Sequence, residues 1–316
     1  MMETENMTCI SISDFTLSGI PDLDDLNFWL GFPLVLLYIM AVLGNLTIIY
    51  IIKVDQALHK PMYIFLFMLS VVDLLIATTT MPKMLAIFWF DSRRITFDVC
   101  LTQVFWIHFL PNIESGILMA MAVDRYVAIS HPLKYSSILT NQTIIKITFS
   151  IMVRGAATEI PLPFLLKRFP LWKSNLLTHS YCLHPEVMKL ACGDITVNVI
   201  LGLVTVFSVM CNDSLFIFFT YLLIIKTVVF LKEESSLKAL STCTAHICVV
   251  LIYYVPLINS TVSNRVPYGS IPNLPILFSN TYLLIPPAIN PLIYGIKTKQ
   301  IRKRLIKLFS NIKCTR

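Results

Sequence analysis

The sequence predicts an all-α membrane protein, a seven-transmembrane helix bundle with a short amphipathic cytoplasmic helix after the seventh span. Composition is the first reason: 56% of the 316 residues are apolar, 14% are charged, and the mean hydropathy is +0.74. A soluble domain of this size needs more charge to cover its surface. The apolar residues also come in blocks of about 20, which suits helices that cross a hydrocarbon core about 30 Å thick. We expect a single domain, residues 1–316.

The expected spans follow from these apolar blocks. In chain order they are 28–52, 61–86, 97–127, 143–166, 194–228, 238–262 and 271–296. A membrane β-barrel would instead show stretches of about ten residues with alternating polarity. Phe32–Ile52 and Leu240–Leu257 are apolar nearly all round, which favours helices.

The distribution of charge predicts the orientation. The N-terminal segment 1–27 has acidic side chains and no Lys or Arg, whereas the tail 297–316 is rich in both. Because cytoplasmic segments collect Lys and Arg, we expect an extracellular N-terminus and a cytoplasmic tail. The net charge of +7 then indicates a tail that faces membrane lipid, not a nucleic-acid surface. Asn6 begins a glycosylation sequon on the expected outer side.

Polar side chains interrupt several spans, at a cost of at least about 2.5–3.5 kcal/mol for each charge near the bilayer centre. Asp73 lies in the second span and Glu114 in the third, while Asn45 and Asn290 lie at comparable depth in the first and seventh. One interpretation is a shared polar cluster that holds water or a cation and rearranges on activation. The other is a static hydrogen-bonded knot between helices. The sequence leaves both open.

Two motifs lie at the expected cytoplasmic ends of spans. Asp124-Arg125-Tyr126 closes the third span, where an acid beside an Arg can form an ion pair that a partner protein breaks. Asn290-Pro291-Leu292-Ile293-Tyr294 closes the seventh span, where a proline removes a backbone donor and kinks the helix. The plainer alternatives are an ordinary charge pair and a kink that only fits the bundle.

Taken together, these and other motifs resemble the vertebrate odorant receptors, of the rhodopsin-like G-protein-coupled receptor class. The matching stretches are Gly44-Asn45, Pro61–Leu66, Met119–Ile129, Lys238–His246 and Pro287–Tyr294, and Tyr181–His184, Lys189–Cys192 and Tyr254–Pro256 resemble the fish-like class I branch. The resemblance implies a plasma-membrane receptor with an odorant pocket among the outer halves of the third, fifth and sixth spans. It also implies coupling to a stimulatory heterotrimeric G protein of the olfactory type.

The resemblance further implies a disulfide between Cys100 and Cys182. Closing a loop of about eighty residues would stabilise the fold by roughly 4 kcal/mol in the chain-entropy model. Class I relatives usually carry three cysteines in the second outer loop, and Trp172 stands where the first is expected. We therefore expect Cys192 to be a free thiol. Cys9 could pair with it, but nothing in the sequence argues for that.

Neither catalysis nor a cofactor is indicated. The nine glycines form no phosphate-cradling loop, and no Lys precedes Lys297 in the seventh span, which excludes a retinal Schiff base at the opsin-like position. His179, Cys182, His184 and Cys192 could be read as a soft-metal site, because imidazole and thiolate suit copper or zinc. A disulfide at Cys182 would remove one ligand, so we expect no metal and no enzyme.

Candidate ligand-binding residues surround an apolar space near the outer ends of the spans. They are His108, Thr261, Arg265, Phe105, Phe109, Tyr254, Leu257 and Val204. His108 lies about two helical turns inward from Cys100, and its alternative role is that of a satisfied core histidine. In class I relatives an Arg at position 265 is associated with carboxylate odorants; its alternative is an Arg that snorkels into the headgroups. The expected ligand is small and mostly apolar, with a carboxylic acid as one option.

The sequence therefore predicts an odorant receptor that activates a G protein. One rival is a chemoreceptor of the same fold that acts outside the nose. The other is an ion channel or transporter that uses Asp73 and Glu114 as an ion path. Transporters tend to show inverted repeats and broken helix pairs, and the sequence shows neither.

Overall fold

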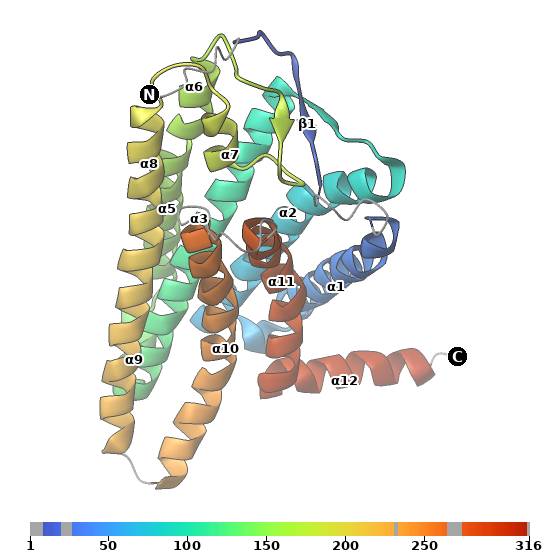
Figure 1. Cartoon of the computed structure of the whole chain (residues 1–316). Coiled ribbons are helices and arrows are strands. Elements are labelled where there is room, and N and C mark those ends of the chain that lie inside the picture. The colour runs from blue at the N-terminus through green and yellow to red at the C-terminus, as the bar shows by residue number, and fades with distance from the viewer. Residues whose placement is uncertain (1–8, 20–26, 231–232, 264–273, 315–316) are drawn as a thin grey trace.

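The computed structural model describes residues 9–19, 27–230, 233–263 and 274–314. Within these ranges seven helical segments are long and apolar enough to cross a membrane, which confirms the predicted bundle. They are α1 (Asn27–Val54), α2 (Pro61–Phe90), α3 (Phe97–Ser130), α5 (Asn141–Glu159) with α6 (Pro161–Lys167), α8 (Thr196–Phe207) with α9 (Ser214–Val229), α10 (Glu233–Ser263) and α11 (Leu274–Lys297). Two short helices, α4 (Tyr135–Ile138) and α7 (His184–Lys189), lie in loops, and α12 (Lys299–Cys314) follows the bundle (Figure 1).

Local sequence explains where several helices begin, break and end. Pro61 occupies the first turn of α2, where its missing N–H costs nothing. Thr140 caps α5 by accepting a hydrogen bond from the backbone N–H of Thr143. Pro161 begins α6 directly after α5, and the six-residue π-helical segment Ser208–Asp213 joins α8 to α9. The fourth and fifth spans are therefore continuous in space but irregular inside the membrane.

The third span is the centre of the bundle. In its most apolar window, 78% of the residues are buried, against 22% in the span formed by α8 and α9. Large side chains of the peripheral helices, such as Phe218 and Phe219 of α9, stay exposed on the outer surface. Exposed apolar side chains over membrane-length helices are expected where lipid is the solvent.

A small three-stranded sheet covers one end of the bundle, which we call the sheet end. β1 (Asp14–Leu17) pairs antiparallel with β2 (Arg94–Thr96) and parallel with β3 (Leu176–Leu177). Trp172, 2% exposed, packs edge-on against Phe15 and Phe97 at ring-centroid distances of 5.5 Å. These strands were not predicted from the sequence, because each is too short to show an alternating pattern.

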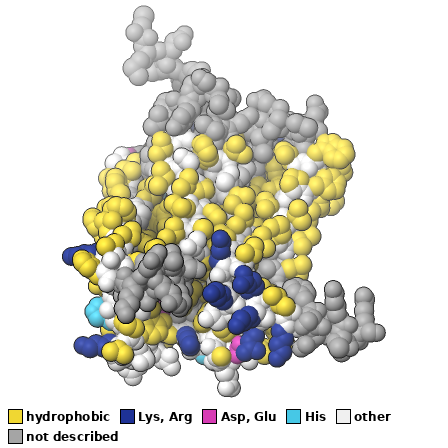
Figure 2. Space-filling model, turned by 90° about the horizontal axis from the view of Figure 1, so that it is seen from below, with side chains coloured by type: hydrophobic (Ala, Val, Ile, Leu, Met, Phe, Trp, Pro, Cys, Tyr) yellow, Lys and Arg dark blue, Asp and Glu magenta, His cyan; other side chains and the backbone are white. Residues whose placement is uncertain are grey.

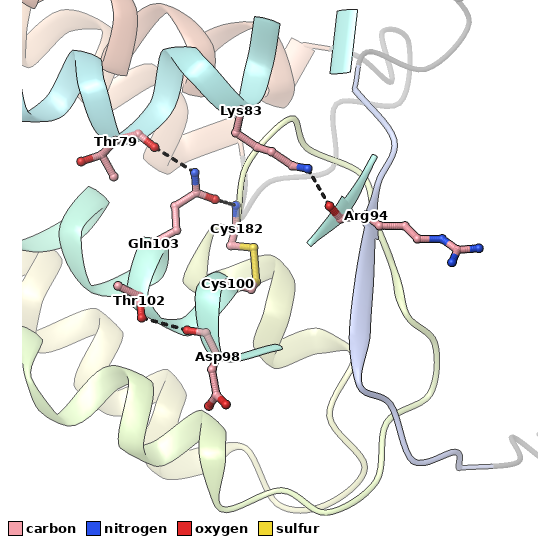
Figure 3. The surroundings of a disulfide bond; sticks show 8 residues. All are labelled: Thr79, Lys83, Arg94, Asp98, Cys100, Thr102, Gln103 and Cys182. Atoms are coloured by element: carbon pink, nitrogen blue, oxygen red, sulfur yellow. Dashed lines mark hydrogen bonds between the residues drawn. A yellow bond between two sulfur atoms is a disulfide. The ribbon is translucent and has the colours of Figure 1, made fainter. Parts of the chain in front are cut away.

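Two disulfides close the sheet end. The bond between Cys100 and Cys182 confirms the expected pair, and Gln103 supports it by accepting from the Cys182 N–H and donating to the Thr79 carbonyl (Figure 3). The second bond joins Cys9 to Cys192, so the expectation of a free thiol at Cys192 was wrong.

Backbone pairing explains this second disulfide. Ile10 and Trp172 exchange two N–H to carbonyl hydrogen bonds of 2.8 Å, and the Cys192 N–H donates to the Leu171 carbonyl. These bonds place the N-terminal segment beside the loop that carries Cys192. Trp172 thus stands where a loop cysteine was expected, and Cys9 of the N-terminal segment provides the partner sulfur.

The first and last spans approach each other closely through Gly44. A Cβ atom at this position would lie 2.7 Å from Cγ of Pro291, so any larger residue would force the helices apart. Asn45 then donates to the Pro287 carbonyl at 2.9 Å and to its own helix at Ala41. Asn45 thereby satisfies a carbonyl of a proline-rich stretch of α11.

The helix α12 lies across the opposite end of the bundle, which we call the α12 end (Figure 1). Ile301 is fully buried, and Leu305 and Leu308 are half-buried, whereas Arg302 and Lys303 are exposed. Arg304 forms an ion pair of 2.5 Å with Asp55, in the loop that follows α1. Figure 2, seen from below, shows Lys and Arg side chains gathered beside a broad hydrophobic surface. In α12 the buried Ile301 and the exposed Arg302 and Lys303 lie on different faces of the helix, which confirms the predicted amphipathic helix.

We predict that a peptide of residues 297–316 is unstructured in buffer and becomes helical on anionic vesicles, as circular dichroism would report. Four basic residues at about 1 kcal/mol each give about 4 kcal/mol, or roughly a thousandfold in binding. Replacing Arg302, Lys303, Arg304 and Lys307 with Gln should remove most of that affinity. A spectrum that vesicles leave unchanged would show that the helix needs the bundle and not the lipid.

Candidate ligand-binding site

A cavity of about 480 Å³ lies inside the bundle near the sheet end. Its walls come from α3, α5, α6, α7, α8, the π-helical segment, α10 and α11. The wall is largely apolar, with side chains such as Ile107, Leu203, Val206 and Leu257. A mostly apolar cavity of this size is typical of a small-molecule site.

Three of the predicted ligand-binding residues line this cavity, namely His108, Leu257 and Thr261. Four others do not. Phe105 and Phe109 stack on each other at 5.0 Å, and Phe109 packs towards Gly155 of α5. Val204 is 52% exposed on the outer surface of the bundle. Arg265 lies outside the described residues.

The predicted residues and the lining of the cavity differ because neighbouring positions on a helix are rotated by about 100°. Tyr253 lines the cavity, and its neighbour Tyr254 instead bonds to Ser115. Likewise Thr205 and Val206 of α8 face the cavity, and Val204 does not. The position of a residue along a span predicts how deep in the membrane it lies. It does not predict which face of the helix the residue occupies, and residues one position apart can point into the cavity or away from it.

Two histidines lie together in the wall. The ring of His108 is bonded through Nδ1 to the Val104 carbonyl at 2.8 Å, and its centroid is 6.1 Å from that of His184. Burial, and then the neighbouring His108, lowers the pKa of His184 to about 3. The His184 ring is therefore neutral at neutral pH. Because Cys182 and Cys192 are both in disulfides, the alternative metal site loses its two sulfur ligands.

A chain of charged and polar groups lies against the cavity, and its contacts were not predicted from the sequence. Arg154 of α5 forms an ion pair of 2.6 Å with Asp213 in the π-helical segment. Asp213 also accepts from Ser115 at 2.7 Å, and Ser115 lies 2.7 Å from the Tyr254 hydroxyl. These contacts join α3, α5, the π-helical segment and α10 through one network.

The network also reaches the cavity wall. Arg154 donates to the backbone carbonyl and to the side-chain oxygen of Asn112, both at 3.1 Å. Asn112 in turn donates to Glu159 at 3.0 Å, and both of these residues line the cavity. A signal was available in the sequence, because Arg154, Glu159 and Asp213 are charges inside apolar spans, each of which invites a functional question.

The predicted polar core is present in part. Asn290 donates to both carboxylate oxygens of Asp73, at 3.1 and 3.3 Å, and to Glu114 at 3.4 Å. Asn45 is held apart from these three by its bonds to Ala41 and Pro287. Both carboxyl groups are fully buried. The cluster joins α2, α3 and α11, as either interpretation of the sequence requires.

At the α12 end, the adjacent side chains of Asp124 and Arg125 lie 3.5 Å apart as an ion pair. Tyr135 donates to Asp124 at 2.6 Å, and burial followed by the Asp124 charge raises the pKa of this tyrosine. Tyr126 points elsewhere, towards the ring of His131. Tyr294 is fully buried and donates to Met121 of α3 at 3.9 Å. These contacts lock α3 to its neighbours at this end.

A second pair at the α12 end was not predicted. The Tyr221 hydroxyl lies 2.6 Å from His246 Nδ1, and His246 Nε2 lies 3.0 Å from the Leu118 carbonyl. The three residues belong to α9, α10 and α3. His246 lay within a stretch used for the family resemblance, but no spacing rule assigns its partners.

We predict that Asp213→Ala destabilises the protein by about 3–5 kcal/mol, because it leaves Arg154 charged and unpaired inside the bundle. Thermal unfolding of the purified protein would measure this, with Asp98→Ala as the control. Asp98 forms an exposed pair with Lys167, which is worth about 0–1 kcal/mol. The double variant Arg154→Met, Asp213→Leu should recover much of the loss. Equal stability of Asp213→Ala and Asp98→Ala would contradict the role of this ion pair.

Comparison with known proteins identifies the family. A family model described as "Olfactory receptor" matches residues 34–312. Human olfactory receptor 51E1 is 53% identical over 309 residues, which is 98% of this chain and 97% of that protein. Mouse olfactory receptor 51E2 is 50% identical over 93% of this chain and 92% of its own length.

The fold has a solved counterpart. The crystal structure of squid rhodopsin matches with a TM-score of 0.75 at 15% identity, over 93% of this chain and 88% of that one. With its seven membrane-length helices, the protein is a multi-pass membrane protein. The chain therefore belongs to the olfactory receptor family, and it is a receptor with the seven-helix fold of rhodopsin, not an enzyme.

Proposed function

We propose that this receptor binds a small, mostly apolar odorant in the cavity and activates a stimulatory heterotrimeric G protein of the olfactory type. The observation that carries the proposal is the apolar cavity of about 480 Å³ at the sheet end, opposite the Asp124–Arg125 pair. A receptor needs two separate sites that share a structural element. Here α10 contributes Leu257 and Thr261 to the cavity and His246 to the α12 end.

We further propose that the sheet end is extracellular and the α12 end cytoplasmic, in the plasma membrane. Both disulfides lie at the sheet end, and disulfides persist in an oxidising space. The basic side chains of α12 suit the inner leaflet, which is negatively charged. Asn6, the proposed glycosylation site, lies outside the described residues, three positions before Cys9 in the sequence.

The proposed mechanism is a shift between two arrangements of α10 against α3. Three side chains of α10 form hydrogen bonds to α3. Tyr253 donates to the Pro111 carbonyl at 2.8 Å. Tyr254 is bonded to the Ser115 hydroxyl and His246 to the Leu118 carbonyl. A ligand that fits one arrangement better moves the population towards it. The G protein would then break the ion pair between Arg125 and Asp124, as the sequence analysis proposed.

A carboxylate head was expected on the ligand because of Arg265, which lies outside the described residues. That expectation stays a proposal, and a panel of short acids, esters, alcohols, aldehydes and amines would test it. The readout is a cyclic-AMP reporter in cells that express the receptor with the olfactory stimulatory G protein. No response above receptor-free cells to any ligand class, with the receptor displayed at the surface, would contradict the proposed function.

We predict that Arg125→Ala abolishes the reporter signal while surface display stays near normal. Arg125 lies 13 residues after the cavity residue Asn112 on α3, about 20 Å away at about 1.5 Å per residue, so it cannot touch a small ligand in the cavity. Arg94→Ala, an exposed arginine at the sheet end, is the matched control and should signal normally. A wild-type response from Arg125→Ala would remove this residue from the coupling mechanism.

A further inference from the structure

Glu159, the last residue of α5, is a carboxyl group in the wall of the cavity. Its side chain is 0% exposed. One oxygen, Oε1, accepts from Asn112 at 3.0 Å and from the Thr158 hydroxyl at 3.3 Å. The other oxygen, Oε2, has no hydrogen-bond partner among the described residues. A buried carboxylate oxygen without a donor is costly, and each such group in a native structure needs an explanation.

The neighbouring charges do not balance Glu159. Arg154 is paired with Asp213 at 2.6 Å, and its second terminal nitrogen donates to Asn112. Arg154 therefore reaches Glu159 only through the neutral amide of Asn112. Arg154 and Asp213 form a pair beside the cavity, and Glu159 in the cavity wall is the carboxyl group that this pair leaves in excess.

The other polar groups in the described part of the wall do not supply the missing charge. Lys189 lines the cavity, but its ammonium is bound to Glu186 at 2.7 Å. Thr205 Oγ1, Asn198 Nδ2 and His184 Nε2 also lack a partner within the described ranges. Threonine and asparagine are uncharged, and His184 is neutral because its pKa is lowered to about 3. Among the described residues of the wall, Glu159 is therefore the carboxyl group whose charge a ligand head would balance.

We infer that the cavity takes a small amine, an alkyl chain with an ammonium head, and that the head binds Glu159. The inference rests on the proposed function and names its ligand class. An ammonium donates charge-assisted hydrogen bonds and carries the charge that balances the carboxylate. Its alkyl chain would lie against the apolar wall of Leu203, Val206 and Leu257. A carboxylate head at the same place would be repelled.

The test compares three probes of equal chain length, pentylamine, pentanol and pentanoic acid, on full-length receptor in lipid nanodiscs. Binding is measured as the probe concentration at which the unfolding temperature of the receptor rises. Signalling is measured with the cyclic-AMP reporter. We expect the amine to bind wild type at lower concentration than the acid or the alcohol. Glu159→Gln keeps the acceptor for Asn112 and removes the charge, so it should weaken amine binding by about a hundredfold or more. Its effect on pentanol should stay below tenfold.

Two further variants complete the design. Asp98→Asn removes an exposed carboxylate outside the cavity and should leave amine binding unchanged. Glu159→Asp keeps the charge on a shorter side chain and should keep the preference for amine over acid, which covers the case in which Glu159→Gln does not reach the surface.

The outcomes are distinct. The inference is overturned if wild type binds the acid as well as the amine, if no amine binding is detected, or if Glu159→Gln weakens amine binding less than tenfold. Binding of the acid alone would instead support the head group expected from Arg265. Amine binding without a signal would leave the inference standing and contradict only the proposed coupling.

Discussion

The ion pair between Arg154 and Asp213 is the contact on which the arrangement of four spans depends. The Asp213 side chain is 2% exposed and that of Arg154 27%, and lipid around the bundle offers no hydrogen bonds, so each charge needs its partner within the protein. Asp213 meets this requirement by accepting from both Arg154 and Ser115. It lies at the end of a π-helical segment, an irregularity that is often found at functional sites. The local widening of the helix and the buried ion pair therefore occur together.

The sheet end is held by a different kind of constraint. Two disulfides and three short strands tie the N-terminal segment, the α2–α3 connection and the long loop after α6 into one cover over the cavity. The core of this cover is Trp172, which packs against Phe15, Phe97 and Phe169. A rigid cover has a consequence for binding: His184 and Lys189 on α7 line the cavity from above, so part of the wall is set before a ligand arrives.

Hydropathy alone predicted the spans, because membrane thickness fixes the length of an apolar helix. For the cavity, the sequence predicted only its depth in the bundle and not all of the residues that line it. His108 and Leu257 line the cavity, whereas Val204 and Tyr254 each lie next to a residue that does. The disulfide of Cys9 could not be predicted at all, since it depends on strand pairing between segments far apart in the sequence. Arg154, Glu159 and Asp213 could have been flagged from their charge, but their pairing depends on helix rotation that the sequence does not determine.

The contacts of α10 with α3 explain how a small ligand could influence the opposite end of the molecule. Tyr253, Tyr254 and His246 each bond to α3, at Pro111, Ser115 and Leu118, along one continuous stretch. Pro256 lies in α10 between these residues and the cavity residue Thr261, where it removes a backbone hydrogen bond and weakens the helix. A ligand that binds both arrangements of α10 equally shifts nothing, however tightly it binds. Coupling therefore requires that the ligand touch a group whose position differs between the two arrangements. In the proposed mechanism Tyr253 is the candidate for this group, because it lines the cavity and donates a hydrogen bond to the Pro111 carbonyl of α3.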